Sequence, residues 1–204
     1  METILNYFSG FTDEQLARFR ALPGAYAEWN QKINVISRKD MADFEVHHVL
    51  HSLAIATQVE WEAGMEVMDL GCGGGFPGIP LAIFFPKVRF LLVDSIGKKL
   101  KVVDAIAGSL GMGNIETRHT RAEDIRDRKF DAVVSRAVAP LGDLWRWSRP
   151  LLRKGASGGG LFCLKGGDLT REIAESATRP NVWELEQLFS EPWFKEKYLL
   201  RVRG

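Results

Sequence analysis

The chain has 204 residues, of which 46% are hydrophobic and 26% charged, proportions typical of a globular protein rather than a disordered or membrane-embedded one. Its net charge of +1 gives no overall attraction to nucleic acid, so any RNA binding has to come from a local patch. No stretch approaches the roughly 18 apolar residues of a membrane span, and the two cysteines lack metal-ligand or disulfide-framework spacing. We therefore expect a cytoplasmic protein without a bound metal and, since no apolar run demands a partner, a monomer.

The N-terminal part is predicted to be helical. Thr12 and Gln15 have the spacing of a capping box, and apolar residues recur at helical intervals from there to Pro23, which indicates the end of this helix. A second helical stretch is expected over residues 25–35, and a third begins at Asp40.

Beyond this region, short apolar runs alternate with helical segments. The predicted strands cover residues 67–70, 88–93, 115–119, 131–135 and 160–164. Helices are expected over 97–110 and between Pro140 and Pro150, and two antiparallel strands over 182–189 and 198–202. Strand alternating with helix predicts an α/β fold with a doubly wound, Rossmann-like parallel sheet. We assign 1–60 to an N-terminal helical region and 61–204 to the core, together forming one compact domain.

The segment after the first predicted strand carries the main functional signal. Asp69 ends this strand, and the chain then runs through Gly71-Cys72-Gly73-Gly74-Gly75-Phe76. Glycines at a strand end let a ligand approach the backbone where a Cβ atom would collide with it. We therefore predict a cofactor at the carboxyl ends of the strands, with contacts at Gly71, Gly73 and Gly75. For Asp69, a structural role in accepting from loop amides and a role in cofactor binding both stay open.

The ends of the next two predicted strands offer acceptors for an adenosine. Asp94 follows Asp69 by 25 residues, where a doubly wound fold places a carboxylate for the ribose hydroxyls. After the third strand, the backbone of Ala122 can meet the adenine ring and Glu123 can accept from its exocyclic amine. An adenosine-containing cofactor is therefore expected.

Two kinds of cofactor fit this pattern. The spacing of Gly73, Gly75 and Gly78 also matches the dinucleotide fingerprint, which leaves an NAD(P)-dependent oxidoreductase as an alternative. Pro77 and Pro80 remove backbone N–H groups that help to hold a pyrophosphate. S-adenosylmethionine has no phosphate, so these prolines favour it as the cofactor of a methyltransferase.

The glycine segment belongs to a longer series of motifs. The series consists of Asn30-Gln31-Lys32-Ile33-Asn34-Val35-Ile36-Ser37, His48, Ser52-Leu53, Asp69 to Leu81, Leu92-Val93-Asp94-Ser95, Gly97-Lys98-Lys99, Arg121-Ala122-Glu123, Phe130-Asp131, Ser135-Arg136-Ala137 and Leu164-Lys165-Gly166. It resembles the glucose-inhibited division protein B family over roughly residues 25 to 170, a far more specific signal than one glycine loop.

This resemblance implies a class I methyltransferase fold and a bacterial enzyme that transfers a methyl group from S-adenosylmethionine to guanine N7 in 16S ribosomal RNA. The implied partner is small-subunit ribosomal RNA or a ribosomal particle. The implied cofactor contacts are Gly71, Phe76, Ala122, Glu123 and Arg136. A small-molecule methyltransferase is the alternative within the same fold, because fold and cofactor do not select the acceptor.

The chain departs from the family pattern in its N-terminal part. His47 and His51 stand where the family usually has an arginine and an aspartate, and Val35 and Ile36 replace Leu-Thr of an Asn-Leu-Thr-Ser motif. These changes concern RNA contacts more than the cofactor site. The histidines lack an HExxH pattern, so no metal site is expected.

The expected chemistry needs positioning more than acid–base catalysis. Guanine N7 carries a lone pair at neutral pH, so no general base is required, and in-line positioning can lower the barrier by roughly 7 to 11 kcal/mol. Arg136 and Lys165 each lie at the end of a predicted strand and are the candidates for positioning the substrate.

A basic, aromatic segment has two interpretations. It contains Arg146, Arg149, Arg153 and Lys154 around Trp145 and Trp147. It can form an RNA-binding surface, or it can be the solvated face of a helix.

Overall fold

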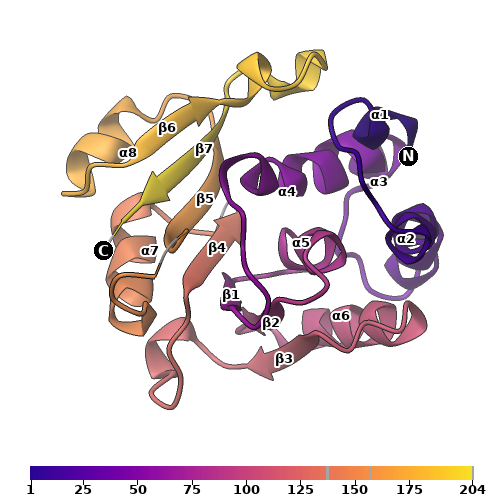
Figure 1. Ribbon diagram of the computed structural model, residues 1–204, viewed down its shortest axis with the longest axis horizontal. Coiled ribbons are helices and arrows are strands. Elements are labelled where there is room, and N and C mark those ends of the chain that lie inside the picture. Colours follow the sequence, from indigo (N-terminus) through magenta and orange to yellow (C-terminus); the bar gives the residue numbers. More distant parts are fainter. Residues whose placement is uncertain (137, 157, 204) are drawn as a thin grey trace.

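The computed structural model describes residues 1–136, 138–156 and 158–203, in which a seven-stranded sheet has the order β3-β2-β1-β4-β5-β7-β6 (Figure 1). The strands are β1 (Glu66–Leu70), β2 (Arg89–Asp94), β3 (Ile115–His119), β4 (Ala132–Arg136), β5 (Gly160–Gly166), β6 (Asn181–Glu184) and β7 (Lys197–Val202). The first five are parallel, and β7 runs antiparallel between β5 and β6. The five parallel strands confirm the predicted doubly wound core.

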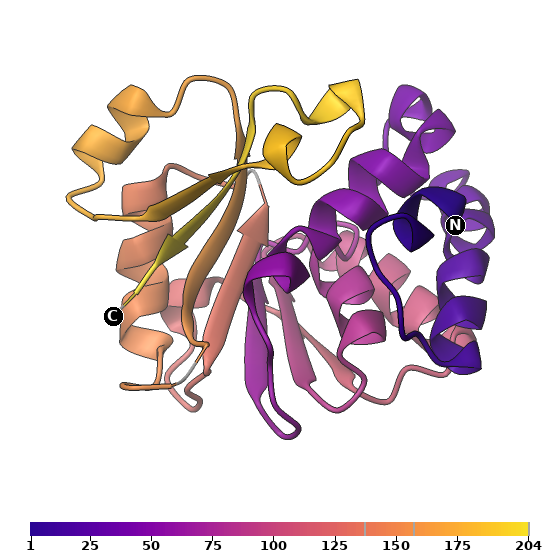
Figure 2. The same ribbon diagram turned by 45° about the horizontal axis from the view of Figure 1, so that its top comes forward.

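Helices cover both faces of this sheet (Figure 2). The α-helices are α1 (Glu2–Leu5), α2 (Asp13–Asn30), α3 (Arg38–Ala42), α4 (His51–Leu53), α5 (Gly78–Phe84), α6 (Gly97–Ser109), α7 (Leu141–Ser148) and α8 (Thr170–Glu175). The 3₁₀ turns are η2 (Ile55–Gln58), η3 (Ala122–Asp124), η4 (Arg149–Leu151), η5 (Leu185–Gln187) and η6 (Pro192–Phe194), and η1 (Glu45–Leu50) is π-helical. None of the described helices is long and apolar enough to cross a membrane.

Alternating strand residues build a core layer on each face. Val67 and Phe90 pack with the α2, α5 and α6 side, whereas Met68 and Leu91 pack with the α7 side. This alternation follows from the two-residue period of a strand. The N-terminal helices share the first of these layers, since Tyr26 of α2 is fully buried in it.

Helix α2 is longer than its sequence predicts. The Thr12–Gln15 capping box is confirmed, with the Gln15 N–H donating to Thr12 Oγ1 at 3.2 Å and the Thr12 N–H donating to Gln15 Oε1 at 3.0 Å. The predicted end at Pro23 is wrong, because α2 continues to Asn30. A proline inside a helix costs about 3 kcal/mol. Burial of Phe19 before it and Tyr26 after it offsets this cost by packing both halves on the core.

The tail also differs from its prediction. The strand expected over 182–189 ends at Glu184, and the chain turns into η5. Leu185 and Phe189 are buried in the core beneath the sheet, which an extended strand continuing outward would not allow. The expected partner strand is present as β7.

Candidate active site

The glycine loop after β1 adopts a conformation that requires glycine. Gly71, Gly73 and Gly75 have φ angles of +69°, +57° and +101°, in the left-handed region. A Cβ atom on Gly71 would lie 2.6 Å from Cγ2 of Val138, whereas one on Gly73 would meet nothing within 4 Å. Gly71 is therefore constrained by both conformation and contact, and Gly73 by conformation alone.

Residues of the N-terminal region contact this loop and fix its position. The Tyr26 hydroxyl of α2 donates to the Gly74 carbonyl at 2.6 Å. The Asn30 side chain accepts from the N–H groups of Val35 and Ile36 at 2.8 and 3.0 Å, which fixes the chain so that Val35 packs on Gly74. The sequence did not reveal the role of Tyr26, because its contact partner lies 48 residues away.

Asp69 is fully buried beneath the loop. Its Oδ2 accepts from the Gly78 N–H at 2.8 Å, while its Oδ1 has no hydrogen-bond partner among the described residues. Burial raises the pKa of Asp69 to about 7, against the opposing effects of the Gly78 amide and Arg136. The bond to Gly78 supports the structural role and does not test the role in cofactor binding.

The raised pKa of Asp69 predicts a pH-dependent stability. Between about pH 4 and 7 the folded protein retains a proton that the unfolded chain releases, so the contribution of this group to the free energy of unfolding falls as pH rises, by up to about 1.4 kcal/mol per pH unit. In Asp69→Asn, stability relative to the wild type should rise with pH over this window and level off above it. Urea unfolding at several pH values measures this, and parallel profiles for the two proteins would contradict it.

A cavity of about 210 Å³ opens beside the loop at the ends of β1, β2 and β3. We call it the cofactor pocket, and its walls are Leu70, Gly71, Val93, Asp94, Ser95, Thr120, Arg121, Ala122, Glu123, Val138 and Trp147. The two oxygens of Asp94 accept from the N–H groups of Gly73 and Ile96 at 2.9 and 2.8 Å. A carboxylate has about four lone-pair sites, so Asp94 retains capacity for two ribose hydroxyls.

The loop amides bear on the choice between the two cofactors. Those of Gly71 and Cys72 donate to the Val93 carbonyl, those of Gly75 and Phe76 to the Cys72 carbonyl, that of Gly73 to Asp94 and that of Gly78 to Asp69. A pyrophosphate needs free N–H donors and is repelled by carboxylates. These six amides already have acceptors within the protein, and Asp94 at the end of β2 and Glu123 of η3 lie in the pocket wall. The donor set fits an adenosine attached to a cationic sulfonium better than a dinucleotide.

A second cavity, of about 550 Å³, adjoins the first at Val138, which lines both. We call it the acceptor pocket, and its walls are Asp40, His47, His48, His51, Arg136, Val138, Ala139, Pro140, Leu164, Lys165, Gly166, Glu172, Trp193 and Lys197. It lies at the ends of β4 and β5, and residues of the π-helical segment η1 and the turn η6 also line it. A π-helical segment at such a position is common in functional sites.

Arg136 is fixed in the wall of the acceptor pocket. Its guanidinium lies 4.9 Å from the ring centroid of Phe76 and donates to the His47 carbonyl at 3.3 Å and to His48 Nδ1 at 3.0 Å. Desolvation lowers the pKa of Arg136 to about 10, so it stays charged at neutral pH. An arginine can only donate, so His48 Nδ1 accepts and the proton of the neutral ring lies on Nε2.

Two histidines of this pocket, His48 and His51, are neutral at physiological pH. Burial, with a smaller contribution from Arg136, lowers the pKa of His48 to about 3 and the pKa of His51 well below its usual value. Trp193 of η6 stacks on His47 with centroids 4.4 Å apart and meets His51 edge-on at 5.0 Å. His47 and His51, two of the departures from the family pattern, thus form one aromatic cluster with Trp193 from the C-terminal part of the chain.

Lys165 also lines the acceptor pocket and forms an ion pair with Glu172. Its Nζ lies 2.7 Å from Glu172 Oε1, which also accepts from the Leu141 N–H at 2.8 Å. Lys165 also donates to the Ala139 carbonyl. Glu172 was not identified from the sequence, because its position on the short helix α8 carries no motif.

The predicted site residues therefore fall into three groups. Gly71, Asp94, Ala122 and Glu123 line the cofactor pocket, and Arg136 and Lys165 line the acceptor pocket. Gly73, Gly75 and Phe76 line neither pocket; Gly73 supports Asp94, and Phe76 is buried beneath Arg136. Ala137 of the Ser135-Arg136-Ala137 motif lies outside the described residues.

Comparison with known proteins connects this geometry to a family. Residues 15–197 match the family model GidB, described as rRNA small subunit methyltransferase G. Proteins named ribosomal RNA small subunit methyltransferase G are 50% identical in Phocaeicola vulgatus, over 99% of this chain and 98% of the relative, and in Porphyromonas gingivalis, over 96% and 90%. The crystal structure of precorrin-6y C5,15-methyltransferase from Geobacter metallireducens shares the fold, with a TM-score of 0.58 and 11% identity over 84% of this chain and 92% of that one. The chain belongs to the GidB family of rRNA small subunit methyltransferase G.

Proposed function

We propose that this protein transfers a methyl group from S-adenosylmethionine to N7 of a guanine in 16S ribosomal RNA. Membership of the family makes it a methyltransferase with S-adenosylmethionine as the methyl donor. The observation that carries the proposal is the pair of adjoining pockets, one with acceptors for an adenosine and the other larger and shaped by Arg136, Trp193 and the Lys165–Glu172 pair.

For the cofactor, we assign Gly71, with Asp94 for the ribose and Ala122 and Glu123 for the adenine. Gly73 and Gly75 do not line the pocket, and we assign them to the shape of the loop that forms its wall. S-adenosylmethionine supplies a methyl group on a positively charged sulfur. The carboxylates in the cofactor pocket favour this positive charge over the negative charge of a dinucleotide. Phe76 supports Arg136 from below and so shapes the site without lining either pocket.

For the acceptor base, we assign Arg136 and Lys165 as positioning residues. Methylation at N7 leaves the guanine cationic, so unneutralised positive charge close to N7 opposes the reaction. His48 and His51 are neutral and Lys165 is paired with Glu172, so these side chains add no net positive charge to the pocket wall. Arg136 stays charged, and we place it at O6 or the RNA backbone rather than at N7. The target base has to leave its stack to reach this pocket, at a cost of a few kcal/mol.

Glu172 is a candidate for selecting guanine. Its Oε1 serves Lys165 and Leu141, and no described residue is hydrogen-bonded to Oε2 in the acceptor pocket. The N1–H and N2–H groups of guanine are donors that match a carboxylate. We expect Glu172→Gln to lower kcat/KM for RNA by about 30-fold, since hydrogen bonds to a charged group contribute about 1.5–3 kcal/mol.

Steady-state methylation with Glu175→Gln as the matched control checks this prediction. Glu175 is on the same helix but pairs with Arg171 at the surface, so its variant should keep wild-type kinetics. Equal kcat/KM for Glu172→Gln and the wild type would exclude the role of Glu172.

The proposed cofactor and base are tested by two measurements on the wild-type protein. Calorimetric titration with S-adenosylmethionine and with NADH should show binding of the first alone. Nucleosides released from small-subunit RNA after reaction with labelled S-adenosylmethionine should contain the label in N7-methylguanosine. Label in another base, or only in a small-molecule acceptor, would reject the proposed substrate.

A further inference from the structure

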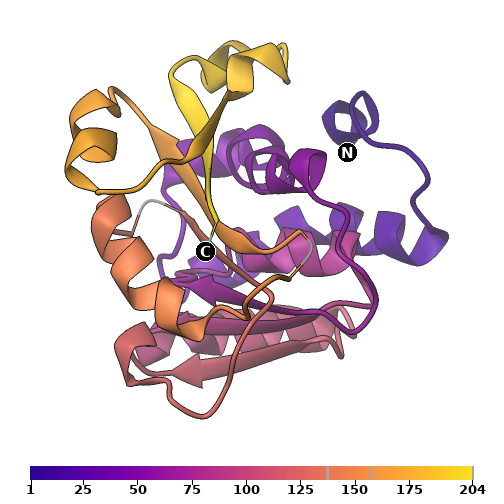
Figure 3. The same ribbon diagram turned by 60° about the vertical axis from the view of Figure 1, so that its left-hand side comes forward.

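A large cavity lies at the amino ends of β4 and β5, at the opposite end of the strands from the glycine loop. This basic pocket has a volume of about 780 Å³, and six cationic side chains line it: Lys129, Arg149, Arg153, Lys154, Arg201 and Arg203. They come from the segment before β4, from η4 and the segment after it, and from the end of β7, which Figure 3 turns toward the viewer together with α7 and α8. No acidic side chain is among its described lining residues.

Most of this charge is not neutralised within the protein. Arg153 pairs with Asp131 at 2.7 Å and with Glu66. The other five cations make no ion pair with a described acidic residue, whereas the neighbouring Arg128 is paired with both Glu66 and Glu116. A chain with a net charge of only +1 therefore concentrates unpaired positive charge in one cavity.

Contacts within the protein fix the residues at the base of the basic pocket. Arg201, which is buried, donates to the Gly159 carbonyl through Nη2 at 2.8 Å and Nε at 3.2 Å, and lies 5.0 Å from the ring centroid of Phe162. Gly160 has a φ of +127°, and a Cβ there would lie 2.6 Å from the Val202 carbonyl oxygen. Desolvation and repulsion from Arg203 both lower the pKa of Arg201. These contacts fix the glycine backbone close to the cations.

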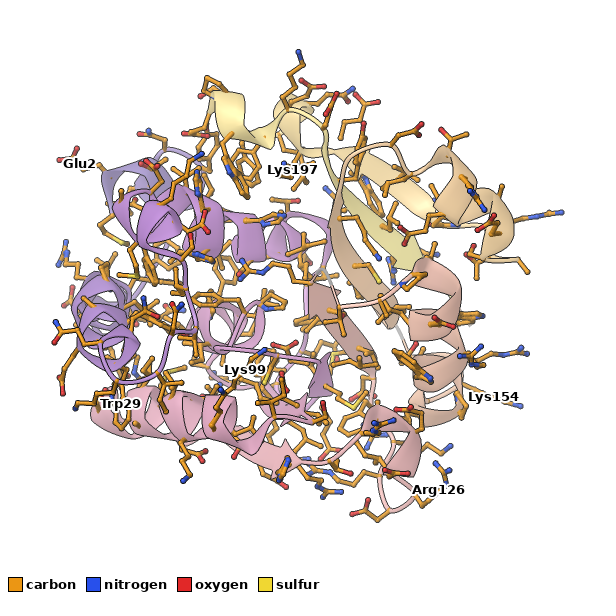
Figure 4. The ribbon with its side chains drawn as sticks, turned by 180° about the vertical axis from the view of Figure 1, so that it is seen from behind. Glu2, Trp29, Lys99, Arg126, Lys154 and Lys197 are labelled. Carbon is orange, nitrogen blue, oxygen red and sulfur yellow. The ribbon has the colours of Figure 1, made fainter. Side chains whose placement is uncertain are left out.

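We infer that the basic pocket binds the phosphate backbone of the RNA substrate, away from the methyl-transfer site, an inference that rests on the proposed function. Its described lining has guanidinium and ammonium groups but no aromatic ring on which a base could stack, so it suits phosphate rather than a base. Lys154 of the basic pocket and Lys197 of the acceptor pocket lie well apart (Figure 4).

The distance between the basic pocket and the acceptor pocket favours a large ligand over a small molecule. The seven residues of β5 run from the basic pocket at Gly160 to the acceptor pocket at Gly166, a span of roughly 20 Å at 3.3 Å per residue. A folded RNA is large enough to occupy both pockets at once, but a small-molecule acceptor is not. Contacts at the basic pocket therefore add affinity for RNA without acting on the reacting base.

The test compares two double variants that remove the same charge. Arg149→Gln with Lys154→Gln alters exposed side chains of the basic pocket, and Arg20→Gln with Lys101→Gln alters exposed, unpaired cations on α2 and α6. Binding to small-subunit ribosomal RNA is measured without cofactor over a range of salt. We expect the first variant to bind RNA about tenfold more weakly and its salt slope to fall by about 1.4 to 1.8, because each phosphate contact contributes about 0.7 to 0.9.

The control variant should stay within about twofold of the wild type, and both should bind S-adenosylmethionine unchanged. Equal losses of RNA affinity in the two double variants would overturn the inference, as would wild-type affinity and slope in the basic-pocket variant. If the basic-pocket variant loses RNA affinity but the wild type transfers no methyl group, the proposed function fails and the RNA site remains. If the wild type does not bind small-subunit RNA, both fail.

Discussion

Replacing Gly71 by alanine is expected to weaken S-adenosylmethionine binding by at least about 100-fold, which corresponds to about 2.7 kcal/mol. Two effects add at this position. A φ of +69° costs an L-residue about 1–2 kcal/mol, and the new methyl group would lie 2.6 Å from Val138, so the loop or Val138 has to move. Either movement displaces the wall of the cofactor pocket. Titration calorimetry gives the affinity, and urea unfolding gives the accompanying loss of stability.

Two further variants separate these effects. Gly73→Ala has the same backbone strain but an open environment, so it should lose less than about tenfold in affinity. Adding Val138→Ala to Gly71→Ala removes the collision and should recover part of the binding. Wild-type affinity in Gly71→Ala, or no difference between the Gly71 and Gly73 variants, would show that the contact with Val138 does not constrain the cofactor pocket.

Replacing Arg136 by alanine is expected to lower kcat for methyl transfer by about 100-fold while changing S-adenosylmethionine affinity by only about threefold. The reason is that Arg136 lines the acceptor pocket, where its donors hold His48 and its face covers Phe76. Without the guanidinium group of Arg136, the acceptor base has no fixed position. Single-turnover transfer and calorimetry on the same preparation measure the two quantities.

The Arg136→Lys variant separates the effect of charge from that of shape, because it keeps the positive charge and loses the planar guanidinium group. We expect it to recover less than half of the lost activation free energy. An unchanged kcat in Arg136→Ala with a large rise in the dissociation constant of S-adenosylmethionine would instead support the cofactor contact that the family resemblance implies.

The strands and the cofactor loop could be predicted because the sequence patterns that indicate them lie within short stretches of neighbouring residues. The apolar runs that became β1 to β5 are bounded by glycines and charged residues, and Asp94 follows Asp69 at the spacing of one crossover unit. The sequence does not predict the end of α2, because the destabilising effect of Pro23 can be read from its neighbours alone. The burial of Tyr26 that offsets this effect depends on contacts with Phe44 and Phe76, which lie far along the chain.

The acceptor pocket was only partly predictable for the same reason. Arg136 and Lys165 follow strands and could be placed at a sheet edge. Trp193 and Glu172 reach this pocket through the fold of the C-terminal part, and nothing in their sequence surroundings indicates that they face His47 or Lys165. The sequence of the basic segment, Trp145 to Lys154, fits both RNA binding and a solvated helix face. In the structure, Arg149, Arg153 and Lys154 line the basic pocket, while Arg146 pairs with Asp143 on α7.

The measurement that bears most directly on the central claim is transfer of labelled methyl from S-adenosylmethionine to small ribosomal subunits that lack the modification, with Arg136→Ala alongside. The account predicts label at N7 of a guanine in 16S ribosomal RNA with the wild-type protein and about 100-fold less label with the variant. Binding of S-adenosylmethionine without transfer to the subunits or to their naked RNA would contradict the RNA assignment. Binding of NAD(H) in place of S-adenosylmethionine would contradict the methyltransferase itself.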